Sequence, residues 1–187
     1  MDPRDVVRRS KRLSSVLRHA PESVGLTLDA AGWADVEALL AALGWTRAEL
    51  EHVVATNDKR RFALDGSGTR IRASQGHSVP VDLGYAARTP PAVLFHGTAE
   101  RNLPRIEAEG LRPGRRHAVH LSPDEVTARA VGARHGRAVV LRVDAAGMTA
   151  AGAVFTRSAN GVWLVDAVPP QHLRQVSGRR AGPAPRR

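Results

Sequence analysis

The stretch that decides the N-terminal fold is RRFALDGSGTRIRA, residues 60–73. The runs RRFAL and TRIRA are typical of short strands, and the Asp65-Gly66-Ser67-Gly68 segment between them has the composition of a turn, so the stretch predicts a hairpin. Side chains alternate along a strand, which puts Arg61 and Phe62 on opposite faces. If Phe62 is part of the core, Arg61 points away from it.

Three helices are expected before this hairpin. Apolar residues recur at helical spacing in residues 5–17, with arginine and lysine between them. A second apolar helical face covers residues 35–43, and Gly44 is placed to end that helix. The sequence Thr46-Arg47-Ala48-Glu49 is a capping-box pattern that starts a third helix. Three small helices followed by a two-stranded wing predict a winged-helix domain.

The second half of the chain has a different pattern. The segment VPVDLGYAARTPP lacks clear periodicity and ends in two prolines, so we place the domain boundary there. Strand-like runs then alternate with short helical stretches, which predicts a small α+β domain. The predicted order is a winged-helix lobe in residues 1–80, a linker in 81–91, a second lobe in 92–178 and a basic tail in 179–187, which we expect to be disordered.

Composition limits the function. The chain has 187 residues, of which 42% are hydrophobic, and a formal net charge of +10. A positive surface attracts polyanions, of which nucleic acid is the commonest, although a basic solvated surface is the alternative explanation. The count of cysteines is 0, which excludes disulfides, thiolate zinc sites and a cysteine nucleophile. Neither a signal peptide nor a membrane-spanning run is evident, so we expect a cytoplasmic protein.

The first candidate site is the pair Arg18 and His19, just before Pro21 ends the helix. Arginine offers a planar fork of donors, and histidine can be a second donor or a proton carrier near neutral pH. A phosphate could be bound there. A solvated helix end, where the helix dipole favours cations, is the alternative, and on these residues alone it is the preferred one.

Further candidates lie in loops and at strand ends. The segment IRASQGHS, residues 71–78, crowds polar donors around a glycine that would allow a phosphate or sugar to approach, or else it is a structural loop. In residues 95–98, Gly97 stands between two polar residues and could offer its backbone to a flat amide ligand. The segment RRHAVHLS, residues 115–122, has too few metal-ligating neighbours for zinc. Ser122 is expected to be an N-cap.

In combination, these segments resemble the Tpt1/KptA family of NAD-dependent RNA 2′-phosphotransferases. The resemblance runs from about Leu13 to Leu173, and the blocks occur in the family's order. They are LSSVLRHAPE, GWADVEALL, VVATNDKRRFAL, IRASQGHS, LFHGT, RHAVHLS, VGARHG and NGVWLV. The resemblance implies an α+β protein with an N-terminal winged-helix lobe, a C-terminal ADP-ribosyltransferase-like lobe and an active site in the cleft between them.

The resemblance also implies site residues. The family's Arg-His-Arg-Arg catalytic tetrad falls on Arg18, His19, Arg61 and Arg116. Residues implied to bind NAD are His96, Gly97, Thr98, Asn102, His120, Ser122, Arg134 and Val162, the last replacing a glutamate common in the wider superfamily. Contact with the RNA backbone is our interpretation for Arg72, Gln75 and His77. No metal is expected.

The implied reaction removes an internal 2′-phosphate from RNA in two steps and consumes NAD. An RNA-2′-phospho-ADP-ribose intermediate forms with release of nicotinamide, and it then yields 2′-OH RNA and ADP-ribose 1″,2″-cyclic phosphate. The resemblance points to tRNA splicing or RNA repair, and we expect a monomer. Two alternatives stay open. One is an ADP-ribosyltransferase acting on protein or on terminal nucleic-acid phosphates, and the other is a non-catalytic winged-helix module that binds nucleic acid.

Overall fold

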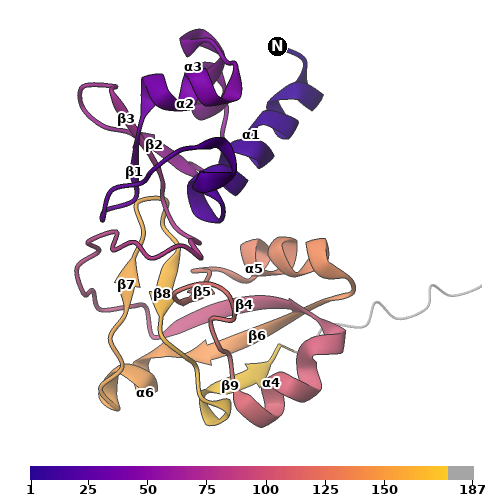
Figure 1. Cartoon of the computed structure of the whole chain (residues 1–187). Coiled ribbons are helices and arrows are strands. Elements are labelled where there is room, and N and C mark those ends of the chain that lie inside the picture. The colour runs from indigo at the N-terminus through magenta and orange to yellow at the C-terminus, as the bar shows by residue number, and fades with distance from the viewer. Residues whose placement is uncertain (177–187) are drawn as a thin grey trace, which may run out of the picture. The chain divides into compact units, whose positions relative to one another are not determined.

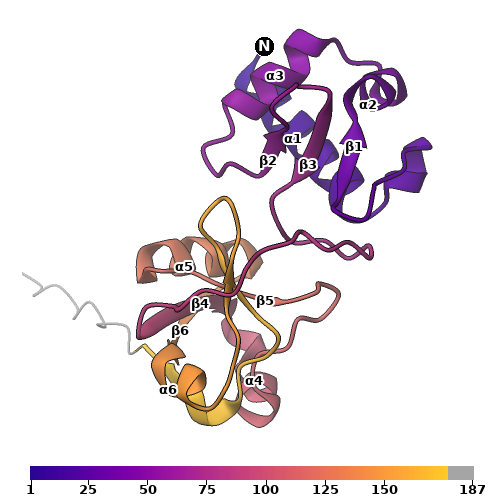
Figure 2. The ribbon, with the colours of Figure 1, turned by 90° about the vertical axis from the view of Figure 1, so that its left-hand side faces the viewer.

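The computed structural model describes residues 1–176, and the chain forms two compact units that we describe separately (Figures 1 and 2). The first unit takes three segments of the chain, Met1–Arg88, Pro113–His120 and Val154–Asp166. Of the described residues, the second contains Thr89–Arg112, Leu121–Ala153 and residues 167–176. The fold is of the mixed α+β class, as predicted, with small antiparallel sheets. The basic tail predicted in residues 179–187 lies outside the described residues.

The three expected helices are confirmed in the first unit. Helix α1 covers Pro3–Arg18, and the side chain of Asp2 accepts from a backbone N–H in its first turn. Helix α2 covers Val36–Leu43 and ends at Gly44, whose φ of +64° is the left-handed conformation expected of a glycine cap. Helix α3 covers Arg47–Ala55 and begins with the predicted capping box. Residues close to each helix end determine where it lies, which is why these ends could be predicted from the sequence.

The predicted hairpin is also confirmed. Strands β2 (Phe62–Leu64) and β3 (Arg70–Ala73) pair in antiparallel fashion, with Phe62 opposite Ala73. A third strand, β1 (Trp33–Asp35), pairs with the other edge of β3 and was not predicted. Both β3 and α3 contact α1. The core between the sheet and the helices contains Leu13, Val16, Leu17, Val36, Leu39, Leu50, Val53, Phe62 and Ile71.

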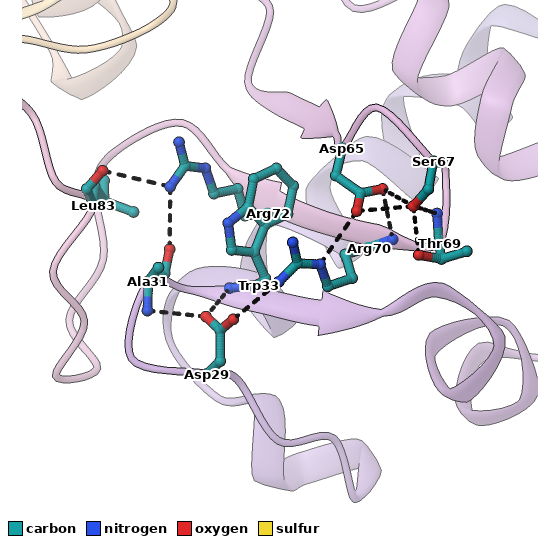
Figure 3. A network of polar contacts seen from close by, with 9 residues as sticks. All are labelled: Asp29, Ala31, Trp33, Asp65, Ser67, Thr69, Arg70, Arg72 and Leu83. Atoms are coloured by element: carbon teal, nitrogen blue, oxygen red, sulfur yellow. Dashed lines mark hydrogen bonds and ion pairs between the residues drawn. The ribbon is translucent and has the colours of Figure 1, made fainter.

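A polar network fixes β1 and the loops beside it (Figure 3). The guanidinium group of Arg72 lies over the Trp33 ring, 4.5 Å from its centroid. Its Nη1 donates to the carbonyl oxygens of Ala31 and Leu83, at 3.3 and 3.4 Å. Asp29 accepts from the backbone N–H groups of Ala31 and Trp33, both at 2.9 Å. Arg72 therefore joins the chain near residue 31 to the segment near residue 83.

The second unit is built on the sheet β4-β6-β9, formed by Val93–Ala99, Ala138–Asp144 and Leu173–Gln175. All of its neighbouring strands are antiparallel. Helix α5 (Glu125–Gly132) packs on β4 and β6. The remaining elements of this unit are η2 (Glu100–Asn102), α4 (Leu103–Glu109), η3 (Ala133–His135), α6 (Ala145–Ala150) and η4 (Pro170–His172).

One predicted helix start was wrong. The N-cap of α5 is Asp124, whose carboxylate accepts from the backbone N–H of Thr127 at 2.7 Å, and not Ser122. Ser122 instead exchanges two backbone hydrogen bonds with Phe95, at 2.7 and 2.9 Å. The pairing with Phe95 keeps Ser122 in extended chain, and Asp124, a residue type that caps helices as well as serine does, takes its place.

The third sheet has the order β5-β8-β7, formed by Val119–Leu121, Trp163–Val165 and Thr156–Arg157. Its strands β7 and β8 lie in the first unit, and β5 begins there and ends in the second. Strands β7 and β9, of two and three residues, were not predicted. Within the described residues, no helix is both long and apolar enough to cross a membrane.

Candidate active site

Arg18 is a buried cation at the end of α1. Its side chain is 8% exposed, and two of its nitrogens, Nε and Nη2, are buried without a hydrogen-bond partner. The pKa of Arg18 is lowered to about 10, first by burial and then by the like charges of Arg116 and Arg61. Burying N–H donors without acceptors is costly. This arrangement is what an anion-binding site needs before its anion arrives.

Arg18 and Arg116 meet at Gly76. A Cβ atom built on Gly76 would lie 3.7 Å from Nη1 of Arg18 and 3.9 Å from Nε of Arg116. Gly76 has a φ of +88°, which a residue with a side chain rarely adopts. The pKa of Arg116 is lowered by desolvation of its guanidinium group, although the residue as a whole is exposed. Two guanidinium groups therefore lie within van der Waals distance of the position that a side chain at residue 76 would take.

Arg61 is the third arginine of the predicted tetrad. Hydrogen bonds hold its backbone at both the N–H and the carbonyl. Its N–H donates to the side-chain oxygen of Asn57 at 3.1 Å, and its carbonyl accepts from the N–H of Ser74 at 2.8 Å. Arg60 has a φ of +42°, and its carbonyl accepts from the Ser74 hydroxyl at 2.9 Å. Phe62 is 5% exposed and belongs to the core. This supports the expectation that Arg61 points the other way.

His19 follows Arg18 and is exposed at the C-cap of α1. Its Nδ1 lies 3.0 Å from the hydroxyl oxygen of Ser78. Burial lowers the pKa of His19, and the neighbouring charges of Arg18, Arg116 and Arg115 lower it further. The imidazole is therefore biased toward its neutral form near pH 7, in which one ring nitrogen can accept a proton.

His77 is close enough to Arg18 and His19 to be affected by their charges, but it is buried. It is 3% exposed, and neither ring nitrogen has a hydrogen-bond partner. Its pKa is lowered to about 4, first by burial and then by Arg18, His117, His19 and Arg72. The ring is therefore neutral at physiological pH. Its burial leaves it in contact with protein, while Gln75 is the more accessible residue of the segment.

We expect His77 to make the protein sensitive to acid. An unfolded histidine binds a proton below about pH 6.5, whereas the folded ring resists it until about pH 4. The contribution of neutral His77 to the free energy of unfolding is therefore fully present above pH 6.5 and is lost as the pH falls from there toward 4. Between pH 7.5 and 4.5 wild type should lose about 2 to 3 kcal/mol more free energy of unfolding than His77→Leu.

Urea denaturation of both proteins at the two pH values measures this difference. His52→Leu, on the exposed face of α3, is the matched control and should keep the wild-type dependence on pH. Equal losses in wild type and His77→Leu would contradict the expectation.

The predicted NAD-binding residues around β4 fall in the second unit. Thr98 is 6% exposed, and its hydroxyl oxygen accepts from the side-chain amide of Asn102 at 3.1 Å. His96 lies on β4 just before Gly97, and Arg134 is exposed in η3. A set of hydroxyl, amide, imidazole and guanidinium groups is of the kind that suits a ligand with an amide, ribose hydroxyls and a pyrophosphate. The donor set thus fits NAD.

Gly97 is needed for packing as well as for any ligand. A Cβ atom on Gly97 would lie 1.6 Å from the carbonyl oxygen of Ala128 in α5, and one on Gly132 would lie 2.8 Å from the carbonyl oxygen of Thr98. Real Cβ atoms never come so close to backbone oxygens. The two glycines therefore let strand β4 and helix α5 approach each other.

The other two predicted NAD-binding residues, His120 and Val162, lie in segments of the first unit. Nδ1 of His120 is 2.9 Å from the carbonyl oxygen of Ala118. A carbonyl can only accept, so Nδ1 carries the proton, and Nε2 of the neutral ring is an acceptor. The N–H of Val162 donates to the hydroxyl of Ser158 at 3.0 Å.

The structure thus brings the four tetrad positions together in one unit and puts six of the eight NAD candidates in the other. Two supporting residues were missed. Asn57 is 8% exposed and bonded to Arg61, and Ser78 is bonded to His19. Both lie in segments that the sequence had singled out, but their roles depend on contacts across the fold. In the part of the chain that the structure describes, no group of three or more potential metal ligands occurs.

Comparison with known proteins identifies the family of the chain. The model of the Tpt1/KptA family, described as RNA 2′-phosphotransferase, matches residues 4–167. A probable RNA 2′-phosphotransferase of Streptomyces coelicolor is 59% identical over 179 residues, which cover 93% of this chain and 97% of the relative. A protein of the same name from Pseudomonas aeruginosa is 50% identical over 182 residues, covering 94% of this chain and 100% of the relative. The chain therefore belongs to the Tpt1/KptA family and is an RNA 2′-phosphotransferase, a transferase enzyme.

Proposed function

We propose that this enzyme uses NAD to remove an internal 2′-phosphate from RNA, and that Arg18, Arg61 and Arg116 hold the phosphate. The observation that carries the proposal is the convergence of Arg18 and Arg116 on Gly76, with two buried N–H-bearing nitrogens of Arg18 lacking acceptors. A phosphate would supply both the missing acceptors and the missing negative charge. Arginine forks match phosphate oxygens in geometry as well as in charge.

The proposed chemistry has two steps. In the first, an oxygen of the RNA 2′-phosphate attacks the anomeric carbon of the nicotinamide ribose, and nicotinamide leaves with the electron pair of the broken bond. In the second, the ribose 2″-hydroxyl attacks the phosphorus, which releases 2′-OH RNA and ADP-ribose 1″,2″-cyclic phosphate. Phosphoryl transfer depends mainly on positioning and on stabilising charge at the phosphoryl oxygens. The three arginines supply both.

Each remaining candidate has a role in this scheme. His96, Gly97, Thr98 and Ser122 would contact the nicotinamide end of NAD, with His120 and Val162 lining the same site. Asn102 and Arg134 would bind the adenosine or pyrophosphate. His19 would donate to the phosphate or carry a proton. Gln75, Arg72 and His77 are the candidates for RNA contact; Gln75 and Arg72 are partly exposed and His77 is buried, which favours the first two.

We also propose the architecture that accompanies this chemistry. Residues 1–80 would act as a winged-helix lobe, which three helices and a three-stranded sheet support. Residues 92–178 would act as an ADP-ribosyltransferase-like lobe, joined to the first by a linker in 81–91. The enzyme would work as a cytoplasmic monomer, without a metal.

The test is to incubate the purified protein with NAD and an RNA oligonucleotide carrying one internal 2′-phosphate, and to identify RNA and small-molecule products by mass spectrometry. The proposal expects 2′-OH RNA, nicotinamide and ADP-ribose cyclic phosphate in equal amounts. RNA that carries ADP-ribose and is not processed further would instead indicate a transferase that stops after one step. Unchanged RNA with no nicotinamide released would overturn the proposal.

A further inference from the structure

The hydroxyl of Ser78 is held between His19 and the end of α1. Its oxygen lies 3.0 Å from Nδ1 of His19 and 3.4 Å from the carbonyl oxygen of Arg18. The backbone N–H of Ser78 donates to the same carbonyl at 2.8 Å. This carbonyl belongs to the last turn of α1, where carbonyls have no partner within the helix. Ser78 therefore completes the helix end and contacts the next side chain at the same time.

The single hydrogen of the Ser78 hydroxyl determines which nitrogen of the His19 ring is protonated. A serine hydroxyl carries one hydrogen, and a carbonyl oxygen can only accept. When the hydroxyl donates to the Arg18 carbonyl, its oxygen can only accept from the ring, so Nδ1 of His19 must carry a proton. We propose that Ser78 is a positioning residue that fixes His19 as the Nδ1–H tautomer and leaves Nε2 as the proton acceptor at the phosphate site. The reverse hydrogen bond, from the hydroxyl to Nδ1, would give the opposite tautomer.

The positive charges around His19 favour its neutral form, and only the neutral ring has two tautomers. The charges that act on the ring are Arg18 of α1 and Arg116 and Arg115 of the segment 113–120, and His77 is a further titratable group near it. None of these groups is negative, and protonation of the ring would add another positive charge beside three guanidinium groups. A neutral imidazole with Nε2 unprotonated can act as a general base.

The role in the reaction rests on the function proposed above. In the second step Nε2 would take the proton from the ribose 2″-hydroxyl while its oxygen forms the new bond to phosphorus. The RNA 2′-oxygen leaves with the electron pair of the broken P–O bond and takes up a proton from solvent. Nδ1–H stays on Ser78 throughout, so the ring keeps its orientation as its charge changes.

The first test needs neither NAD nor RNA. Proton–nitrogen NMR correlation of the ¹⁵N-histidine-labelled protein at pH 7.5 reports which nitrogen of each ring is protonated, and His19→Asn identifies the His19 signals. We expect a protonated Nδ1 in wild type and Ser78→Thr, and a shift toward protonated Nε2 in Ser78→Ala. Ser23→Ala, which removes a hydroxyl bonded at 2.6 Å to the Ala20 carbonyl, should leave the tautomer unchanged. A protonated Nε2 in wild type, or no shift in Ser78→Ala, overturns the inference.

The second test measures turnover. Ser78→Ala should slow the second step by about three- to tenfold, the effect of one hydrogen bond, with an unchanged KM for RNA and recovery in Ser78→Thr. A Ser78→Ala enzyme that loses rate but keeps the wild-type tautomer would overturn the inference in favour of a purely structural serine. If Ser78→Ala shifts the tautomer but His19→Asn keeps full activity, the proposed role of His19 in the reaction is overturned. The effect of Ser78 on the ring would stand.

Discussion

Replacing Arg18, Arg61 or Arg116 by alanine should cause the intermediate RNA-2′-phospho-ADP-ribose to accumulate. The first step needs little help at the phosphate, because the phosphate is already anionic and nucleophilic. The second step builds charge on the phosphoryl oxygens that these guanidinium groups would stabilise. Removing one preorganised donor of this kind costs roughly 10²- to 10³-fold in rate. We expect a loss of that order in the second step, read in single-turnover experiments that follow both RNA species.

Matched controls come from neighbouring arginines. Arg115 precedes Arg116 and is exposed, and Arg12 is exposed on α1. Arg12→Ala removes the same charge away from these residues and should accumulate no intermediate. Arg115→Ala removes a charge that lowers the pKa of His19 but is assigned no contact with the phosphate, so it too should accumulate no intermediate. Loss of NAD binding in the Arg18, Arg61 or Arg116 variants, with no intermediate formed, would refute their assignment to the phosphate.

Gly97→Ala should strongly destabilise the second unit. The new Cβ atom would have to occupy space 1.6 Å from the Ala128 carbonyl oxygen, which is backbone and cannot rotate away. Relief requires moving α5 off β4, and overpacking of a well-packed interior costs about 1 to 3 kcal/mol, occasionally more. The backbone clash puts this variant at or above the upper end, about 3 kcal/mol. The loss is measured as a lower midpoint of urea denaturation and a lower Tm, with loss of activity.

Gly66→Ala is the control for this change. Gly66 lies in the β2–β3 turn, and a Cβ atom there would meet nothing within 4 Å. The variant should have the stability of wild type to within about 0.5 kcal/mol. If Gly97→Ala were equally stable, the close approach of β4 and α5 would not depend on this glycine.

Local signals explain how much of the fold the sequence could predict. Thr46 and Glu49 form a capping box through side chains three residues apart, and Gly44 ends α2 by its own backbone conformation. Strand β1 could not be found this way, because it consists of three residues directly before α2 and exists only through its pairing with β3. The prediction of the N-cap of α5 was wrong for a related reason. Ser122 pairs with Phe95, and Asp124 caps the helix instead.

The site shows the same division. Arg18 and His19 were noticed as a pair, but on those residues alone a solvated helix end was the preferred explanation, and only the family resemblance joined them to Arg61 and Arg116. The burial of Arg18 and the approach of Arg18 and Arg116 to Gly76 depend on how distant segments pack. Ser78 was in a segment singled out as rich in donors, yet its bond to His19 requires the segment to return to the end of α1. The catalytic and NAD-binding roles of these residues stay predictions.

The division of the first unit into three chain segments has a consequence for biosynthesis. Arg18 and Arg61 leave the ribosome in the opening segment, but Arg116 arrives only with 113–120, and the unit is complete only after Asp166. Closing such long loops carries an entropic cost before any contact compensates for it. A nascent chain halted before Pro113 would therefore expose two cationic side chains of an unfinished site. The enzyme should become competent late, when nearly all of its chain has been translated.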